Sequence, residues 1–470
     1  MSLVYSGNFA AQAEMSEQDV TRVSMGINPF GFSWRLGVGE EFQTPEVVLA
    51  YSGSGLSGMS RIYHKLYRTR LCRGKYRDAI RPILVNNWEA TYFDFTEEKI
   101  LEIARKANEL GIELMVLDDG WFGKRDNDKC SLGDWTADRK KLPDGIEGLA
   151  AKVTAMGMKF GLWFEPEMVS EDSDLYRAHP DWCIHIDGRP RTGSRNQLVL
   201  DLSRSEVCDY IVSAVSNVLS SAPITYVKWD MNRNITEQSN AELPHRYMLG
   251  LYDVLERLTS AFPEVLFEGC ASGGGRFDAG MLYYFPQYWT SDDTDAIERV
   301  YIQHGTSVVM PASTMGAHVS AVPNHQVGRT TPLSLRGNIA MAGQFGYELD
   351  LTKLTDAEAE EIKAQIQKYR MIRETIHKGD MYRLLSPFEG NTAAWEYVYD
   401  SRVVLIYCVT KAQLLGGYAN MKLMGLDEDA VYIDTESGKT YRGDYLMNAG
   451  LHFERDKDYI TNILIFEQLA

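Results

Sequence analysis

The chain contains few residues that could build a disulfide framework or a metal centre. Six cysteines occur among 470 residues, and none of them stands in C-x-x-C spacing. Nine histidines show neither H-x-x-x-H nor H-E-x-x-H spacing. Because disulfide scaffolds and zinc sites depend on such spacings, we expect mostly reduced, buried thiols, no metal ion and no cofactor.

Long apolar runs and an excess of positive charge are also absent. No run approaches about 18 apolar residues, and the N-terminus lacks the charged and apolar regions of a signal peptide. A formal net charge of −17 disfavours nucleic acid and anionic membranes as partners, because their binding depends on clustered Lys and Arg. We therefore expect a cytoplasmic protein that binds a small neutral ligand.

Apolar runs that end in acidic or aromatic residues recur along residues 80–385. Eight of them are expected to form buried strands: Ile83–Asn86, Leu114–Leu117, Phe160–Phe164, Leu198–Leu200, Ile224–Val227, Val265–Phe267, Tyr288–Trp289 and Ser307–Met310. Helical periodicity follows Thr96 and stops at Gly111, and further apolar stripes follow Ser205 and Pro244. Eight β–α units with polar strand ends are typical of a (β/α)8 barrel, and no Gly-x-Gly-x-x-Gly follows the first strand. We therefore predict an α/β fold with a TIM barrel over residues 80–385.

Two further regions flank the predicted barrel. Residues 386–470 contain short alternating segments, namely Ala394–Val398, Val403–Tyr407 and Asn462–Phe466, with a turn at Ser437–Gly438. They predict a C-terminal antiparallel β-domain. Residues 1–79 mix glycine-rich loops with a strand candidate at Glu46–Tyr51 and a helix near residues 59–68.

The charged strand ends contain the candidate active site. Lys228 and Asp230 follow the run Ile224–Val227, and because side chains alternate along a strand, both should point to the same face. Chemistry in parallel α/β proteins gathers at the carboxyl ends of the strands, so Asp230 is the first catalytic candidate. The alternative is an Asp that caps the next helix.

Five tryptophans stand beside carboxylates at these strand ends: Trp88, Trp121, Trp163, Trp229 and Trp289. Carboxylates accept hydrogen bonds from hydroxyl groups, and an indole face covers the apolar face of a pyranose. A single tryptophan would more often be a core residue, but the group of five favours sugar binding.

Several motifs together resemble the α-galactosidases of glycoside hydrolase family 36. They are Leu117–Phe122, Trp163–Glu167, Lys228–Arg233, Cys270–Arg276 and Ser291–Arg299, and the likeness runs from about Tyr5 to the C-terminus. The resemblance implies a retaining α-galactosidase for melibiose- and raffinose-type substrates, with Asp230 as nucleophile and Asp292 as acid/base. It also implies a set of residues that bind the sugar hydroxyls: Trp88, Asp118, Asp119, Trp163, Arg195, Lys228, Cys270, Ser272 and Gly273.

The residues themselves fit these roles. Lys228 can help to keep Asp230 ionised, as a nucleophile requires. Asp292 lies among other carboxylates, where like charges and partial burial raise a carboxyl pKa, as a general acid requires. Asp293 and Asp295 are more simply explained as negative charge at the start of the next helix, and the choice of Asp292 over Asp293 depends on the resemblance. A retaining mechanism predicts a separation of about 5–5.5 Å between the two catalytic carboxyl groups.

Gly273–Gly275 and Cys270 each allow a second interpretation. No Lys-Ser/Thr follows the glycines, so a tight loop that brings backbone N–H groups to a sugar hydroxyl is favoured over a phosphate loop. Cys270 could be a thiol nucleophile, but no histidine is near it in the sequence. A small residue that lines the pocket is favoured.

One departure from the family concerns the N-terminus. Family members usually begin with a large β-sandwich, and residues 1–79 would contain only its last stretch and a linker helix. Apolar surface left by the absent domain would favour a homo-oligomer. Two other functions stay open, namely an α-N-acetylgalactosaminidase of the same family and a truncated, weakly active sugar-binding protein.

Overall fold

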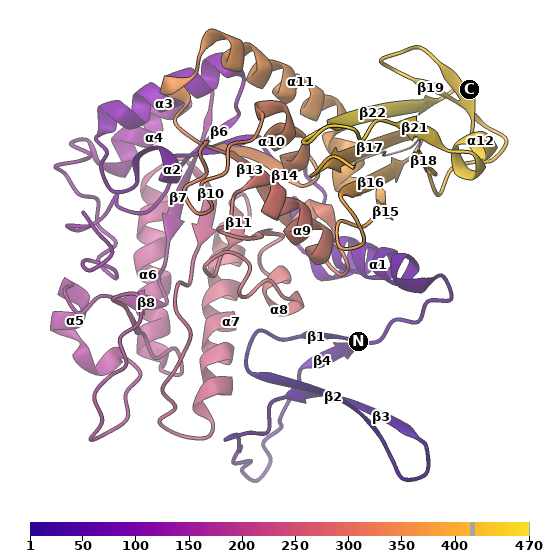
Figure 1. Ribbon diagram of the computed structural model, residues 1–470. Coiled ribbons are helices and arrows are strands. Elements are labelled where there is room, and N and C mark those ends of the chain that lie inside the picture. The colour runs from indigo at the N-terminus through magenta and orange to yellow at the C-terminus, as the bar shows by residue number, and fades with distance from the viewer. Residues whose placement is uncertain (414–418, 470) are drawn as a thin grey trace.

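The computed structural model describes residues 1–413 and 419–469 and is built around a closed barrel of eight parallel strands (Figure 1). The barrel strands are β5 (Leu84–Asn86), β6 (Leu114–Leu117), β7 (Lys159–Phe164), β10 (Ile224–Trp229), β11 (Leu266–Gly269), β12 (Gln287–Trp289), β13 (Met315–Ser320) and β14 (Gln344–Glu348). Strand β14 pairs in parallel with β5 and thereby closes the ring. The predicted TIM barrel is confirmed.

Two of the eight expected strands are wrong. Residues 198–200 contribute β9 (Leu198–Val199), which pairs antiparallel with β8 (Met168–Val169) in a small sheet separate from the barrel. Residues 307–310 form turns, because their backbone N–H groups donate to carbonyl groups at the end of the preceding helix. Their places in the barrel are taken by β13 and β14, whose polar residues and glycines hide the strand pattern.

Helices lie in the segments between the strands, and the long ones cover the outside of the barrel (Figure 1). They are α2 (Trp88–Thr91), α3 (Glu97–Leu110), α4 (Gly145–Ala155), α5 (Asp174–Ala178), α6 (Ser205–Ser221), α7 (Leu243–Ala261), α8 (Ala279–Leu282), α9 (Ala296–Thr306), α10 (Leu333–Ala340) and α11 (Asp356–Lys378). The predicted ends of α3 are confirmed: the Thr96 side chain accepts a hydrogen bond from the Lys99 N–H, and Gly111 ends the helix in a left-handed conformation. Pro244 lies in the first turn of α7.

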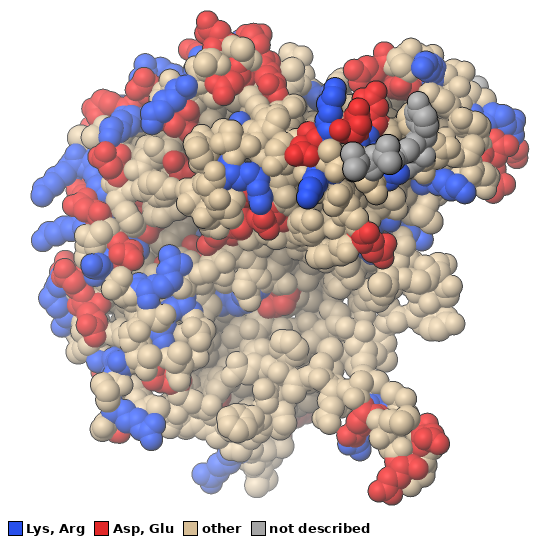
Figure 2. Space-filling model, in the orientation of Figure 1, with Lys and Arg blue, Asp and Glu red and all other residues tan. Residues whose placement is uncertain are grey.

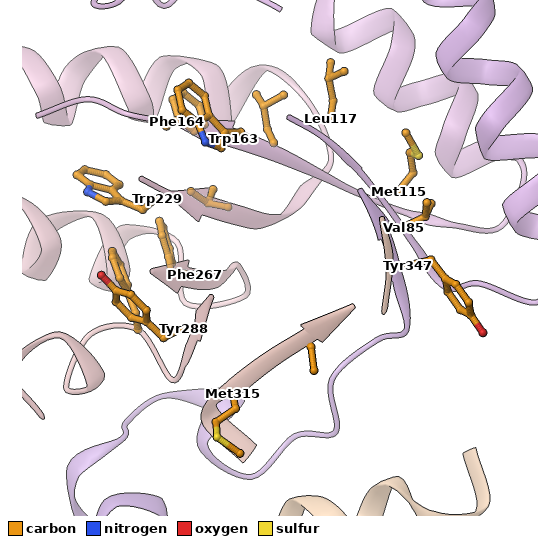
Figure 3. Close-up of a cluster of buried hydrophobic side chains, with 14 of the residues drawn as sticks. Val85, Met115, Leu117, Trp163, Phe164, Trp229, Phe267, Tyr288, Met315 and Tyr347 are labelled. Carbon is orange, nitrogen blue, oxygen red and sulfur yellow. The ribbon is translucent and has the colours of Figure 1, made fainter. Parts of the chain in front are cut away.

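Alternate residues of the barrel strands face two different environments. One set packs in the main core with the apolar faces of the surrounding helices and includes Val85, Met115 and Trp229, which are labelled in Figure 3. The other set forms a separate buried cluster and includes Leu114 and Tyr226. Side chains two residues apart on a strand point to the same side. The polar side chains that follow this second set at the strand ends therefore point into the barrel.

The flanking regions are both built from antiparallel strands. Near the N-terminus, β1 (Ser2–Val4) pairs with β4 (Glu46–Val48), β2 (Phe9–Met15) forms a hairpin with β3 (Thr21–Ile27), and α1 (Gly55–Leu66) leads to the barrel. The predicted C-terminal β-domain is confirmed as a six-stranded sheet in the order β15-β16-β17-β22-β19-β20.

The strands of this C-terminal sheet are β15 (Asp380–Leu385), β16 (Thr392–Tyr399), β17 (Arg402–Val409), β19 (Val431–Asp434), β20 (Thr440–Arg442) and β22 (Thr461–Gln468). Beside it, β18 (Ala419–Met421) pairs with β21 (Leu451–Phe453), and α12 (Gly443–Asn448) follows β20. The sheet begins before the expected boundary at residue 386, because β15 pairs with β16. Residues 414–418 and 470 of the expected domain 386–470 lie outside the described residues. In the part of the chain that the structure describes, no helix is long and apolar enough to cross a membrane.

Candidate active site

A cavity of about 270 Å³ lies among the carboxyl ends of the barrel strands. It is lined by eight of the predicted site residues, namely Trp88, Asp118, Asp119, Trp163, Arg195, Lys228, Asp230 and Asp292. The other three, Cys270, Ser272 and Gly273, lie on the loop that follows β11. The structure thus brings together side chains from six strand ends and from the segment before β9.

Asp230 follows the last residue of β10 and is buried. The Met231 N–H donates to its Oδ1 at 2.8 Å. Asn232 Nδ2 and Trp163 Nε1 donate to its Oδ2 at 2.7 and 3.2 Å. Three hydrogen bonds from neutral donors fix the orientation of this carboxyl group. Its alternative role, as the cap of the next helix, is excluded because α7 begins only at Leu243.

Lys228 points into the same cavity as Asp230, as the alternation along β10 predicts. Its Nζ lies 2.9 Å from Asp118 Oδ2, and both side chains are buried. Burial lowers the pKa of Lys228, but the neighbouring carboxylates, with Asp118 first, outweigh this effect and raise its pKa well above the ordinary value. The cation is therefore retained at any working pH.

Asp292 is a carboxyl group whose surroundings favour the protonated form. Burial, followed by the negative charge of Asp230, raises its pKa to about 6, although Lys228 opposes the shift. Trp289 Nε1 donates to its Oδ1 at 3.1 Å, and Gln326 Nε2 donates to its backbone carbonyl at 2.7 Å. A carboxyl group in such a setting can hold a proton near neutral pH and release it during a reaction.

Asp118 and Asp119 are neighbours with different partners. Asp118 Oδ2 accepts from Asn86 Nδ2 at 2.6 Å in addition to its pairing with Lys228. Asp119 is held by the guanidinium group of Arg125, whose Nε and Nη2 lie 3.0 and 2.9 Å from its two oxygens. Burial raises the pKa of Asp119, with Arg125 acting against the shift. The two carboxyl groups are therefore fixed before any ligand arrives.

The loop after β11 approaches the cavity closely. Arg195 Nη1 donates to Asn232 Oδ1 at 3.0 Å and to Ser272 Oγ at 3.1 Å, and the Ser272 hydroxyl lies 3.1 Å from the same Asn232 oxygen. A Cβ atom at Gly273 would come within 2.6 Å of the Asp292 backbone nitrogen, and its φ is +83°. Only glycine fits at this position.

Two alternative interpretations of this loop lose support. Burial raises the pKa of the Cys270 thiol well above its ordinary value, which disfavours a thiolate nucleophile. Arg276 is bound to Glu167 through two hydrogen bonds of 3.0 and 2.6 Å and so does not face a phosphate. Asp295 caps α9, as expected, by accepting hydrogen bonds from the backbone of the first helical turn.

The five strand-end tryptophans divide into two groups. Trp88, Trp163 and Trp289 line the cavity. Trp121 and Trp229 are fully buried in the core, and their indole N–H groups donate to the Trp163 carbonyl and to Glu167. The prediction of a sugar-facing role is therefore wrong for Trp121 and Trp229. Trp229 lies on the outer face of β10, and Trp121, in the loop after β6, packs against Trp135 and Phe164 in the core.

Some residues of the cavity had no predicted role. They are Glu89, Phe93, Arg125, Asp128, Glu165, Gln197, Asn232, Thr294, His325, Gln326 and Glu348. Glu165 and Asn232 stand inside the strand-end motifs, so their positions were available from the sequence. Glu348 ends β14, a strand that the apolar pattern did not reveal.

Known protein families and known proteins are similar to this chain over most of its length. The family profile Melibiase matches residues 41–379, and profiles of the C-terminal and N-terminal domains of glycosyl hydrolase family 36 match residues 392–466 and 1–37. Alpha-galactosidase AgaA of Geobacillus stearothermophilus is 59% identical over 98% of this chain and 64% of its own length. The bifunctional alpha-galactosidase/sucrose kinase AgaSK of Mediterraneibacter gnavus is 50% identical over 96% of this chain and 48% of its own length.

Solved structures are equally similar. The crystal structure of AgaA superimposes with a TM-score of 0.98 at 58% identity and covers 100% of this chain and 67% of the AgaA chain. Variants of that enzyme are described in complex with raffinose and with stachyose. The chain thus spans 64% and 48% of the lengths of the two relatives named above.

Proposed function

The chain belongs to glycoside hydrolase family 36, and on this basis we propose that it is a retaining α-galactosidase. Its substrates would be melibiose- and raffinose-type oligosaccharides with a terminal α-linked galactose. The main observation behind the proposal is that two carboxyl groups, Asp230 and Asp292, line the same cavity but have different surroundings. Asp230 is fixed in orientation by three hydrogen bonds, whereas burial raises the pKa of Asp292 to about 6.

Each carboxyl group has one role in a double displacement. Asp230 attacks the anomeric carbon while Asp292 gives its proton to the leaving oxygen, which yields a galactosyl ester of Asp230 and the free aglycone alcohol. Asp292 then takes a proton from water, the water oxygen attacks the anomeric carbon, and Asp230 is released. The net stereochemistry is retention, with α-galactose as the first product.

The remaining predicted residues are proposed to hold the sugar. Asp118, Asp119 and Lys228 present fixed charges to hydroxyl groups, and Trp88 and Trp163 supply apolar faces. Arg195, Cys270, Ser272 and Gly273 would border the sugar on the side of the loop after β11. On the face shown in Figure 2, acidic and basic side chains intermingle around a largely uncharged central area, which suits a neutral ligand.

The test is a comparison of three substrates: a nitrophenyl α-galactoside, its N-acetylgalactosamine analogue and melibiose. Hydrolysis of the first and third supports the proposal. Preference for the N-acetyl analogue would favour an α-N-acetylgalactosaminidase, and binding of galactose without turnover would favour a sugar-binding protein. Detection of β-galactose as the first product by NMR would exclude the retaining mechanism.

We also propose that the chain is divided into three structural regions, residues 1–79, 80–385 and 386–470. The location is proposed to be cytoplasmic, and the protein is proposed to form a homo-oligomer. The oligomer is supported by apolar side chains exposed in the first region, among them Phe9, Met15, Phe30, Val38 and Tyr51. Light scattering combined with a galactose titration tests it. A clean monomer, with or without galactose, would contradict the proposed homo-oligomeric state.

A further inference from the structure

Glu165 is a buried acidic residue of the cavity for which the proposed mechanism has no use. It follows β7 and has no exposed surface, yet it lines the same cavity as Asp230. Trp163, two residues earlier, faces the cavity as well and donates to Asp230. Alternation along the strand therefore places Glu165 beside the nucleophile and not in the outer core.

The carboxyl group of Glu165 is bound only by neutral donors. The backbone N–H of Asn232 donates to its Oε1, and Gln197 Nε2 donates to its Oε2 at 2.9 Å. Within residues 1–413 and 419–469, Glu165 forms no ion pair. Arg125, whose charge acts on Glu165, directs its donors to Asp119 and to the Cys130 carbonyl.

Asn232 links Glu165 to the nucleophile. Its Nδ2 donates to Asp230 Oδ2 at 2.7 Å, while its Oδ1 accepts from Arg195 and Ser272 at 3.0 and 3.1 Å. Glu165 holds the backbone of Asn232 by accepting a hydrogen bond from its N–H. A shift of that backbone would move the side-chain amide and with it the hydrogen bond that orients Asp230.

We propose that Glu165 is a positioning residue of the active site, which holds Asn232 and through it the Asp230 carboxylate, and that it does so as a neutral carboxylic acid. The proposal rests on the proposed function of Asp230. A protonated carboxyl group still accepts from Asn232 through its carbonyl oxygen. In the neutral form Glu165 also adds no second negative charge beside Asp230.

The surroundings of Glu165 support the neutral form. Burial, followed by the negative charge of Asp230, raises the pKa of Glu165 to about 8, with Asn232 and then Arg125 acting in the opposite direction. Gln197 suits such a group, because an amide can donate to an ionised carboxylate or, turned by 180°, accept from a protonated one. Its Oε1 has no partner among the described residues.

Glu167 offers a matched comparison two residues further along the chain. It is also fully buried, but the two terminal guanidinium nitrogens of Arg276 donate to it. Trp229 and Tyr247 donate to it as well. Burial raises the pKa of Glu167, but Arg276 outweighs this effect and the net pKa is lowered. The same change from Glu to Gln should therefore have different consequences at the two positions.

The first test is kinetic, with an aryl α-galactoside at pH 6. Glu165→Gln preserves a carbonyl oxygen for Asn232 and should retain most of the wild-type kcat. Glu165→Ala removes the contact and should lower kcat by about 100-fold, a loss typical of a displaced catalytic group, with little change in KM. If Glu165→Gln loses as much activity as Glu165→Ala, an ionised Glu165 is required and the proposal is overturned.

The second test measures the pH dependence of stability and needs no activity. A carboxyl group whose pKa is raised from 4.5 to about 8 in the folded protein contributes stability below its ordinary pKa and loses it as pH rises through the folded value. The Tm of Glu165→Gln minus that of the wild type should therefore increase between pH 5 and 8. Glu167→Gln should lower Tm by a similar amount throughout this range.

A Tm difference for Glu165→Gln that stays flat between pH 5 and 8 would refute the neutral state of Glu165. Because this measurement is independent of hydrolysis, it distinguishes failure of the Glu165 proposal from failure of the proposed function. A wild-type protein that hydrolyses no galactoside would refute the function and leave the stability comparison interpretable.

Discussion

The buried pair of Lys228 and Asp118 offers a strong test of the electrostatics of this site. The two charged atoms lie 2.9 Å apart, with 8% and 4% of the side chains exposed. Lys228→Met keeps most of the unbranched side chain and removes the charge together with the N–H donors of the ammonium group. It leaves Asp118 as a buried carboxylate without its cation, and it removes the positive charge that also acts on Glu348 and Asp230.

The expected cost follows from the distance and the burial. At 2.9 Å and an effective dielectric constant of about 20, the attraction is about 6 kcal/mol. Part of it offsets the desolvation of the two ions, so removal of one partner should cost about 3–5 kcal/mol. Urea unfolding at pH 7, followed by tryptophan fluorescence, measures this as a lower midpoint.

Two further variants make the measurement specific. Asp118→Asn in the Lys228→Met background removes the unpaired charge and should recover part of the lost stability. Arg139→Met breaks an exposed pair with Glu147, whose side chains are 58% and 48% exposed, and should cost at most about 1 kcal/mol. A cost below about 1 kcal/mol for Lys228→Met, or no recovery in the double variant, would refute the reasoning.

Three other predictions concern the aspartates. Asp230→Gly should abolish hydrolysis but not folding, and azide should restore some activity with an aryl galactoside; near-normal turnover would remove Asp230 as nucleophile. Asp292→Asn should impair melibiose far more than an aryl galactoside, and the wild-type kcat/KM on melibiose should fall as pH rises through about 6, because the acid then loses its proton. Equal losses on both substrates would contradict this role. Asp295→Ala removes the cap of α9 and should cost about 1 kcal/mol, seen as a lower Tm; an unchanged Tm would show that the cap is dispensable.

The sequence by itself determined the barrel and the position of Asp230. Apolar runs ending in charged residues predicted six of the eight strands, because a strand buried on both faces is apolar until it reaches the open end. The period of two along β10 placed Lys228 and Asp230 on one face. Local signals at Thr96 and Gly111 predicted both ends of α3.

Tertiary structure decided which apolar segments joined the barrel. Ser307–Met310 is as apolar as a strand, but its N–H groups bond locally, and β13 and β14 take the places beside β12 and β5. Strand pairing joins residues far apart in the sequence, so a local pattern cannot specify it. Trp121 and Trp229 also lie in the core, although both stand beside carboxylates in the sequence. For Trp229 the period of two along β10 predicts this face, because Lys228 and Asp230 occupy the other one.

Tertiary structure also decided the partners and the proton states of the acidic residues. Four carboxyl groups follow an apolar strand, yet their partners differ. Asp118 pairs with Lys228 and Asp119 with Arg125. Glu165 accepts from the neutral amide groups of Gln197 and Asn232, and Glu167 pairs with Arg276. A carboxyl pKa depends on burial and on charges within a few ångströms, and these distances exist only after the chain has closed the barrel.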